Sequence, residues 1–118
     1  MGKFFKLIED FSPPMPAEVA SPVLWGDIKV IKERLSNEFE KIEFGRDTMY
    51  APTMSPAHML KLFEKNAGPL ANLVKSLADD PAKLNKLRNA ALDLIEKFFS
   101  NNFLKQDFLM TRCIKKSF

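Results

Sequence analysis

The longest helical pattern in the chain covers residues 80–101. Apolar side chains recur there every three or four positions, and charged side chains fill the other faces, which is the spacing of an amphipathic helix. Pro81 suits the first helical position and Asp79 or Asp80 suits the N-cap. We therefore expect one long helix that packs on shorter elements and stops at Asn101 and Asn102. Its apolar positions are Leu84, Leu87, Ala91, Leu94, Ile95 and Phe98.

Four shorter helices are predicted by the same periodicity. Asp27 is placed to cap the second, and Ser55 followed by Pro56 gives the cap-then-proline order at the start of the third. Trp25 precedes the second helix, and we expect it to be largely buried against the first turns, as a hydrophobic staple is. The predicted helices cover residues 2–11, 27–35, 55–65 and 69–77.

A proline-rich segment, residues 12–24, separates the first two helices. Its prolines exclude helix and favour an extended path. The simpler interpretation is a stiff linker that crosses the surface. The alternative is a ligand for a domain that binds polyproline helices. The prolines are Pro13, Pro14, Pro16 and Pro22.

Two strands are predicted, at about residues 39–45 and 107–115, with residues 45–54 as a loop. The second strand is apolar on both faces: Phe108, Met110 and Ile114 on one, Leu109 and Cys113 on the other. Such a strand is typical of a sheet interior covered on both sides. Because a two-stranded sheet is marginal alone, the sheet looks incomplete.

These elements predict an α+β fold, mostly helical, with about five helices and one short antiparallel β pair. A chain of 118 residues predicts one domain. We expect a helix at residues 1–11, the linker at 12–24, and a helical cap with a two-stranded sheet at 25–118.

Composition narrows the function classes. The net charge is only +3 and lysines alternate with glutamates, so we expect no nucleic-acid partner. The single cysteine, Cys113, offers neither a disulfide framework nor a metal-binding spacing and favours a reducing, cytoplasmic location. The sequence contains no run of about 18 apolar residues, so we expect no membrane span.

Five segments, taken in order, resemble the C-terminal half of class I S-adenosylmethionine-dependent methyltransferases of the broad type 11 small-molecule group. Residues 2–5 are similar to the helix after that family's fifth strand, and residues 21–27 to its linker and next helix start. Residues 39–44 and 108–114 are similar to its sixth and seventh strands. Ser55-Pro56 and Gly68-Pro69 resemble the starts of its paired substrate-cap helices.

The resemblance implies S-adenosylmethionine as the cofactor of the full-length family, bound at a glycine-rich turn of a Rossmann-like sheet. The four glycines here, Gly2, Gly26, Gly45 and Gly68, are scattered and form no G-x-G turn. No cofactor-binding residue can therefore be assigned. We expect a substrate-cap segment that does not transfer methyl groups alone, whether as a truncated product or as half of a split enzyme.

The resemblance also implies that the region before the cap helices faces the acceptor substrate. The candidate substrate-binding residues are Met49, Tyr50, Met54 and His58. Loop packing is the structural alternative for the first three, and an ordinary surface histidine for the last. No nucleophile–base pair or metal-ligand spacing is present, so no catalytic or metal-binding residue is predicted.

A second hypothesis is a non-enzymatic helical module that binds a protein partner or an apolar ligand. Partners are also expected from the incomplete sheet. One edge of the last strand should lack a neighbour, and Phe4, Phe5 and Phe11 should lack cover. We expect the second copy of a homodimer, or a missing cofactor-binding half, to supply the neighbouring strand and the cover. The alternative is a monomer whose N-terminal helix or proline-rich linker folds over the open edge.

Overall fold

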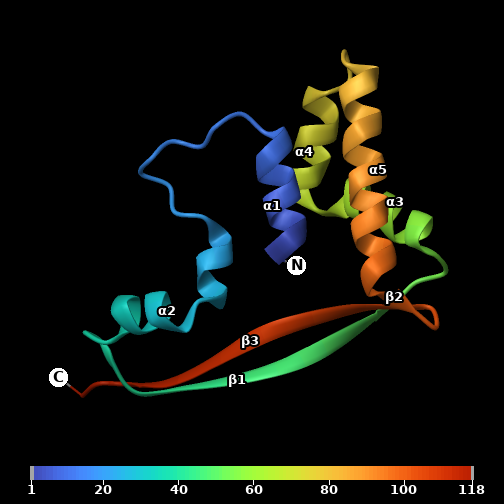
Figure 1. Ribbon diagram of the computed structural model, residues 1–118. Helices are drawn as coiled ribbons and strands as arrows, with labels where there is room; N and C mark the ends of the chain where they lie inside the picture. The colour runs from blue at the N-terminus through green and yellow to red at the C-terminus, as the bar shows by residue number, and fades with distance from the viewer. Residues whose placement is uncertain (1, 118) are drawn as a thin grey trace. The chain divides into compact units, whose positions relative to one another are not determined.

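The computed structural model describes residues 2–117, and these form an α+β fold dominated by helices, as expected. The sheet order is β1-β3-β2. The elements in chain order are α1 (Gly2–Phe11), the short 3-10 helix η1 (Pro22–Gly26), α2 (Ile28–Leu35), β1 (Phe39–Pro52), α3 (Pro56–Asn66), α4 (Gly68–Ser76), α5 (Pro81–Phe98), β2 (Phe99–Ser100) and β3 (Phe103–Lys115) (Figure 1).

The helix starts are where local chemistry predicts them. The side chains of Asp27, Ser55 and Asp80 each accept a hydrogen bond from a backbone N–H of the first helical turn. Pro56 and Pro81 occupy first-turn positions, where the missing N–H costs no helical bond. Three helices therefore begin at residues that satisfy their free donors.

The long helix ends earlier than predicted, at Phe98. Asn101 and Asn102 have φ angles of 50° and 61° and form a two-residue turn between β2 and β3, in which Ser100 pairs with Phe103. Two successive left-handed residues are the mark of a type I′ hairpin turn, and asparagine tolerates that conformation better than most residues. Asn101 and Asn102, which were expected to end the long helix, instead form a hairpin turn between two strands.

The strands are longer than predicted. β1 continues to Pro52, so the predicted loop at residues 45–54 is wrong over most of its length, and β3 begins at Phe103. Polar residues such as Arg46 and Asp47 suggested a loop. They are exposed within the ladder, where a polar side chain has no burial cost, so pairing with β3 decides their conformation.

The chain divides into two compact units, 1–14 with 50–106 and 15–49 with 107–118, and β1 and β3 contribute to both. Whether they fold as the single domain expected from the length stays a prediction.

The first unit holds the main apolar core, built by α1, α3, α4, α5 and the start of β3 (Figure 1). Phe4 is 7% exposed and packs edge-to-face on Phe63 at 5.1 Å between ring centroids. The expectation that α1 lacks cover is therefore wrong for Phe4, because helices rather than a sheet bury it. The core residues are Phe4, Ile8, Met59, Leu60, Leu70, Leu73, Leu77, Leu87, Ala91, Ile95 and Leu104.

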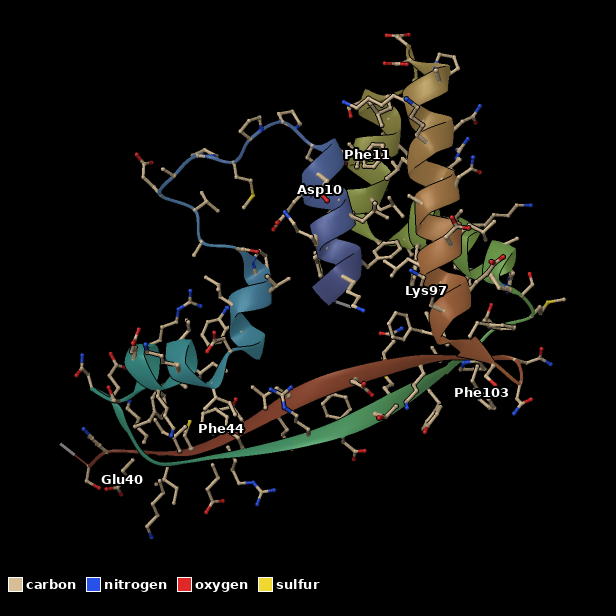
Figure 2. All side chains as sticks on the ribbon, viewed as in Figure 1. Asp10, Phe11, Glu40, Phe44, Lys97 and Phe103 are labelled. Atoms are coloured by element: carbon tan, nitrogen blue, oxygen red, sulfur yellow. The ribbon has the colours of Figure 1, made fainter. Side chains whose placement is uncertain are left out.

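The second unit packs α2 beside the β1–β3 ladder. Ile31 on α2 is 1% exposed, and the Lys32 ammonium lies 5.9 Å from the ring centroid of Phe44 on β1 (Figure 2). Trp25 was expected to be buried but is 53% exposed. The Arg34 guanidinium lies 4.8 Å from its ring, so the indole rests against a cation on the helix surface and does not enter a core.

One face of this ladder is uncovered. The hydroxyl of Thr48 donates to the carboxylate of Asp107 at 2.6 Å, so these side chains share a face, and Phe44 shares it by alternation. Even-numbered residues of β3 lie on the opposite face. The prediction that β3 is covered on both sides is wrong there: the exposed fractions are 39% for Phe108, 50% for Met110 and 50% for Ile114.

A β-bulge interrupts β1. Between the Thr48–Asp107 bond and the bond from the Lys116 N–H to the Glu38 carbonyl, the β1 side advances by ten residues and the β3 side by nine. β1 therefore carries one extra residue. Lys41 has a φ of 48°, the left-handed conformation found at the first position of one bulge type, and we place the bulge there.

Candidate functional site

The predicted site residues lie where β1 ends and α3 begins, within the first unit. Thr53, the residue after β1, is 6% exposed, and its N–H donates to the carbonyl of Asn102 in the hairpin turn at 2.9 Å. Its hydroxyl lies 3.2 Å from both the Ser55 carbonyl and Nδ1 of His58. Thr53 therefore joins the turn, the end of β1 and the start of α3.

His58 is oriented by the helix start. Its backbone N–H donates to Oγ of Ser55 at 3.1 Å, and its Nδ1 accepts from the N–H of Met54 at 3.4 Å. The first bond is that of a capping box, but the ring of His58 bonds the N–H of Met54, the residue before the N-cap Ser55, and not the N–H of the cap itself. Since an amide can only donate, the proton of the neutral ring resides on Nε2.

This geometry limits the chemistry available to His58. A histidine that activates a hydroxyl needs a free ring nitrogen facing it and a third group that orients the ring. Nδ1 faces Thr53 but already accepts from the Met54 amide. The arrangement therefore suits a fixed ring that presents Nε2–H as a hydrogen-bond donor, and it does not form a nucleophile–base pair.

Tyr50 lies in the same unit and forms an aromatic pair. Its ring packs edge-to-face on Phe103, the first residue of β3 (Figure 2), with centroids 6.2 Å apart. Tyr50 is 60% exposed and Phe103 is also exposed. Paired rings open to solvent offer an apolar surface with one phenolic hydroxyl, which is a surface suited to contacting a ligand or partner.

The other two candidates are not assembled with these groups. Met49 precedes Tyr50 in β1, and successive strand residues point to opposite faces, so the two side chains do not line one site. Met54 contributes its backbone amide to the His58 ring, while its side chain is 79% exposed. The structure thus brings together the backbone of Met54, the ring of His58 and a residue that sequence reasoning missed, Thr53.

Thr53 and Phe103 were missed for different reasons. Thr53 fell within a predicted loop, and only its proximity to the Ser55-Pro56 helix start signalled a role. Phe103 follows Asn101-Asn102, and two adjacent asparagines before an apolar run are a recognisable hairpin signal.

Among residues 2–117, no three histidine, cysteine, aspartate or glutamate side chains are grouped so that they could hold a metal ion. In the same range no helix has the length and apolar character needed to cross a membrane. In comparisons with known proteins, the chain matches no protein-family model, no curated protein and no solved structure.

Proposed function

We propose that this chain is a methyltransferase-like substrate-cap segment that acts with a cofactor-binding half and is inactive alone. The observation that carries the proposal is the pairing of β3 directly beside β1, the two segments that resemble the family's seventh and sixth strands.

Two further features support the proposal. In the family the seventh strand runs antiparallel between the fifth and sixth. Here, within residues 2–117, β3 has β1 on one side and only the two-residue β2 on the other, and Phe108 and Met110 are exposed. A sheet that lacks its remaining strands and covering helices would have such an edge and face.

The groups available to an acceptor substrate are the paired rings of Tyr50 and Phe103 and the phenolic hydroxyl of Tyr50. An aromatic pair and one donor suit a small, partly apolar acceptor molecule better than a highly charged one. None of these groups supplies a base, so in this proposal the chain positions the acceptor, and the reactive methyl group comes from S-adenosylmethionine held elsewhere.

Calorimetric titration of the chain with S-adenosylmethionine tests the first half of the proposal, and we expect no binding heat. A micromolar dissociation constant would contradict it. Reading the open reading frame and its neighbours upstream of the Met1 codon tests the second half. We expect a strand, a G-x-G turn and a helix to be encoded there; their absence from that region would count against the split-enzyme interpretation.

The second candidate is a non-enzymatic binding module, favoured by the exposed Tyr50–Phe103 pair. The two functions differ in what Tyr50→Ala changes. If the chain is a cap segment, the substitution weakens acceptor binding only in the presence of the cofactor-binding half. If it is a binding module, the substitution weakens ligand binding by the chain alone.

A further inference from the structure

The edge of β3 that faces away from β1 is open for most of its length. β2 pairs with β3 only at Phe99–Leu104 and Ser100–Phe103, whereas β3 continues to Lys115. Within residues 2–117 the sheet order places no other strand on that side. A long strand edge of this kind is a template for pairing with another strand.

The direction of the free backbone groups follows from two fixed points. The N–H of Lys116 donates to the Glu38 carbonyl, toward β1, and Phe103 pairs with Ser100 on β2, away from β1. Successive residues of a strand direct their N–H and C=O groups to alternate sides. Both fixed points therefore assign the odd-numbered residues from 105 to 115 to the open edge.

We propose that two copies of this chain associate through this edge, with the two β3 strands antiparallel about a two-fold axis at Thr111. Residues 107, 109, 111, 113 and 115 of each copy then exchange backbone hydrogen bonds with the other. The inference concerns the separate chain, goes beyond the proposed function and does not depend on it.

Charge selects this register over its neighbours. With the axis at Thr111, Asp107 lies opposite Lys115 of the second copy, and symmetry produces this pair twice. Moving the axis to Met110 places Lys105 opposite Lys115, and moving it to Arg112 places that arginine opposite itself. Opposite charges across an antiparallel pair stabilise it and like charges destabilise it, so only the Thr111 register has complementary ends.

Apolar pairing supports the same register. The exposed side chains of β3 lie on the uncovered face of the ladder, and the axis at Thr111 places Phe108 opposite Ile114 of the second copy. Aromatic and β-branched side chains are a favourable cross-strand pair. Met110 of each copy then lies opposite Arg112 of the other, between the two Phe108–Ile114 pairs, and the apolar side chains of the two β3 strands share one face. Self-pairing thus reduces exposed strand edge and joins two small apolar patches.

Analytical ultracentrifugation over a concentration series tests the proposal. The wild-type chain should sediment as a dimer, with twice the 13.5 kDa chain mass, at micromolar concentration. Asp107→Lys or Lys115→Asp alone should weaken association by about tenfold, since each turns two attractive pairs into repulsive ones. The double variant Asp107→Lys/Lys115→Asp should restore association. Asp47→Lys, the same charge reversal on β1, is the matched control and should leave association unchanged.

A cysteine cross-link locates the axis independently. Facing residues that exchange backbone bonds have Cα atoms about 5.5 Å apart, within disulfide range. Thr111→Cys in a Cys113→Ser background should therefore form a covalent dimer under mild oxidation, whereas Gly45→Cys in the same background should not. A monomeric mass at every concentration, equal association of all charge variants, a double variant that stays weak, or no cross-link in folded Thr111→Cys protein would each overturn the proposal.

Discussion

Arg88 on α5 forms a two-pronged ion pair with Glu64 on α3. Nε of Arg88 lies 2.8 Å from Oε1 of Glu64, and Nη2 lies 3.1 Å from Oε2. Both side chains are partly shielded from water. The pair joins two helices that both contribute to the main core.

Replacing Arg88 by lysine should lower the free energy of unfolding by about 1 kcal/mol, because lysine keeps the charge but cannot make both parallel bonds. Urea denaturation monitored by circular dichroism measures this difference. Lys86→Ala, at an exposed position on the same helix, should change the free energy by less than about 0.5 kcal/mol. An equal effect of the two substitutions would mean that the two parallel hydrogen bonds between Arg88 and Glu64 contribute nothing to stability.

The pair should also be insensitive to moderate alkali. The hydrogen bond to Glu64 raises the pKa of Arg88 above its ordinary value. A group with a raised folded pKa contributes stability fully below its unfolded pKa and loses it only as the pH rises above that value. The stability difference between wild type and Arg88→Met should therefore be the same at about pH 7 and about pH 9, by urea denaturation at both values.

Leu87 on α5 is 1% exposed, and we expect Leu87→Ala to lower the free energy of unfolding by about 2–5 kcal/mol through lost burial and a residual cavity. Leu62→Ala on α3 is the control, since Leu62 is 36% exposed and should cost about 1 kcal/mol or less. Thermal unfolding of both variants checks which substitution costs more stability. A larger loss for Leu62→Ala than for Leu87→Ala would contradict the core assignment.

Lys41→Gly should stabilise the chain by about 0.5–1 kcal/mol, because glycine adopts the positive φ of the bulge without the steric cost that lysine carries. Glu43→Gly, on the same strand but outside the left-handed region, should destabilise it by a similar amount. Chemical denaturation measures the change in the free energy of unfolding of each variant. A gain for Lys41→Gly and a loss for Glu43→Gly support the bulge, and a loss in both variants would refute it.

Trp25→Ala should lower stability by no more than about 1 kcal/mol, since the indole is half exposed and its described ring contact is the Arg34 cation. The burial expected from the sequence would instead imply a loss of about 3–5 kcal/mol, as for a buried tryptophan. Differential scanning calorimetry distinguishes the two, because a fall in melting temperature as large as that of Leu87→Ala would restore the original prediction.

The accuracy of the sequence predictions follows the range of the interactions involved. Helix starts at Asp27, Ser55 and Asp80 were predictable because a cap acts within one turn. The lengths of β1 and β3 were not, because pairing between distant segments decides whether a polar stretch is strand or loop, and Thr48 and Asp107 are 59 residues apart.

The candidate site shows the same division. His58 could be placed in the first turn of a helix from Ser55-Pro56 alone. Its ring orientation depends on the Met54 amide and on Thr53, and Thr53 is held by Asn102 from the distant hairpin turn. The sequence near residue 58 does not reveal the contact with Asn102 that holds Thr53.

The extra residue at Lys41 sets how the start of β1 tolerates change. Phe39 and Ile42 are both half-buried although they are three positions apart, because the bulge switches side-chain alternation between them. Deleting Lys41 would give a more regular ladder and leave Phe39 and Ile42 two positions apart on the same face, with Glu40 on the other face. In a lineage of such chains, a one-residue deletion at position 41 should therefore be tolerated better than one at position 43, which would turn Phe39 and Ile42 to the opposite face.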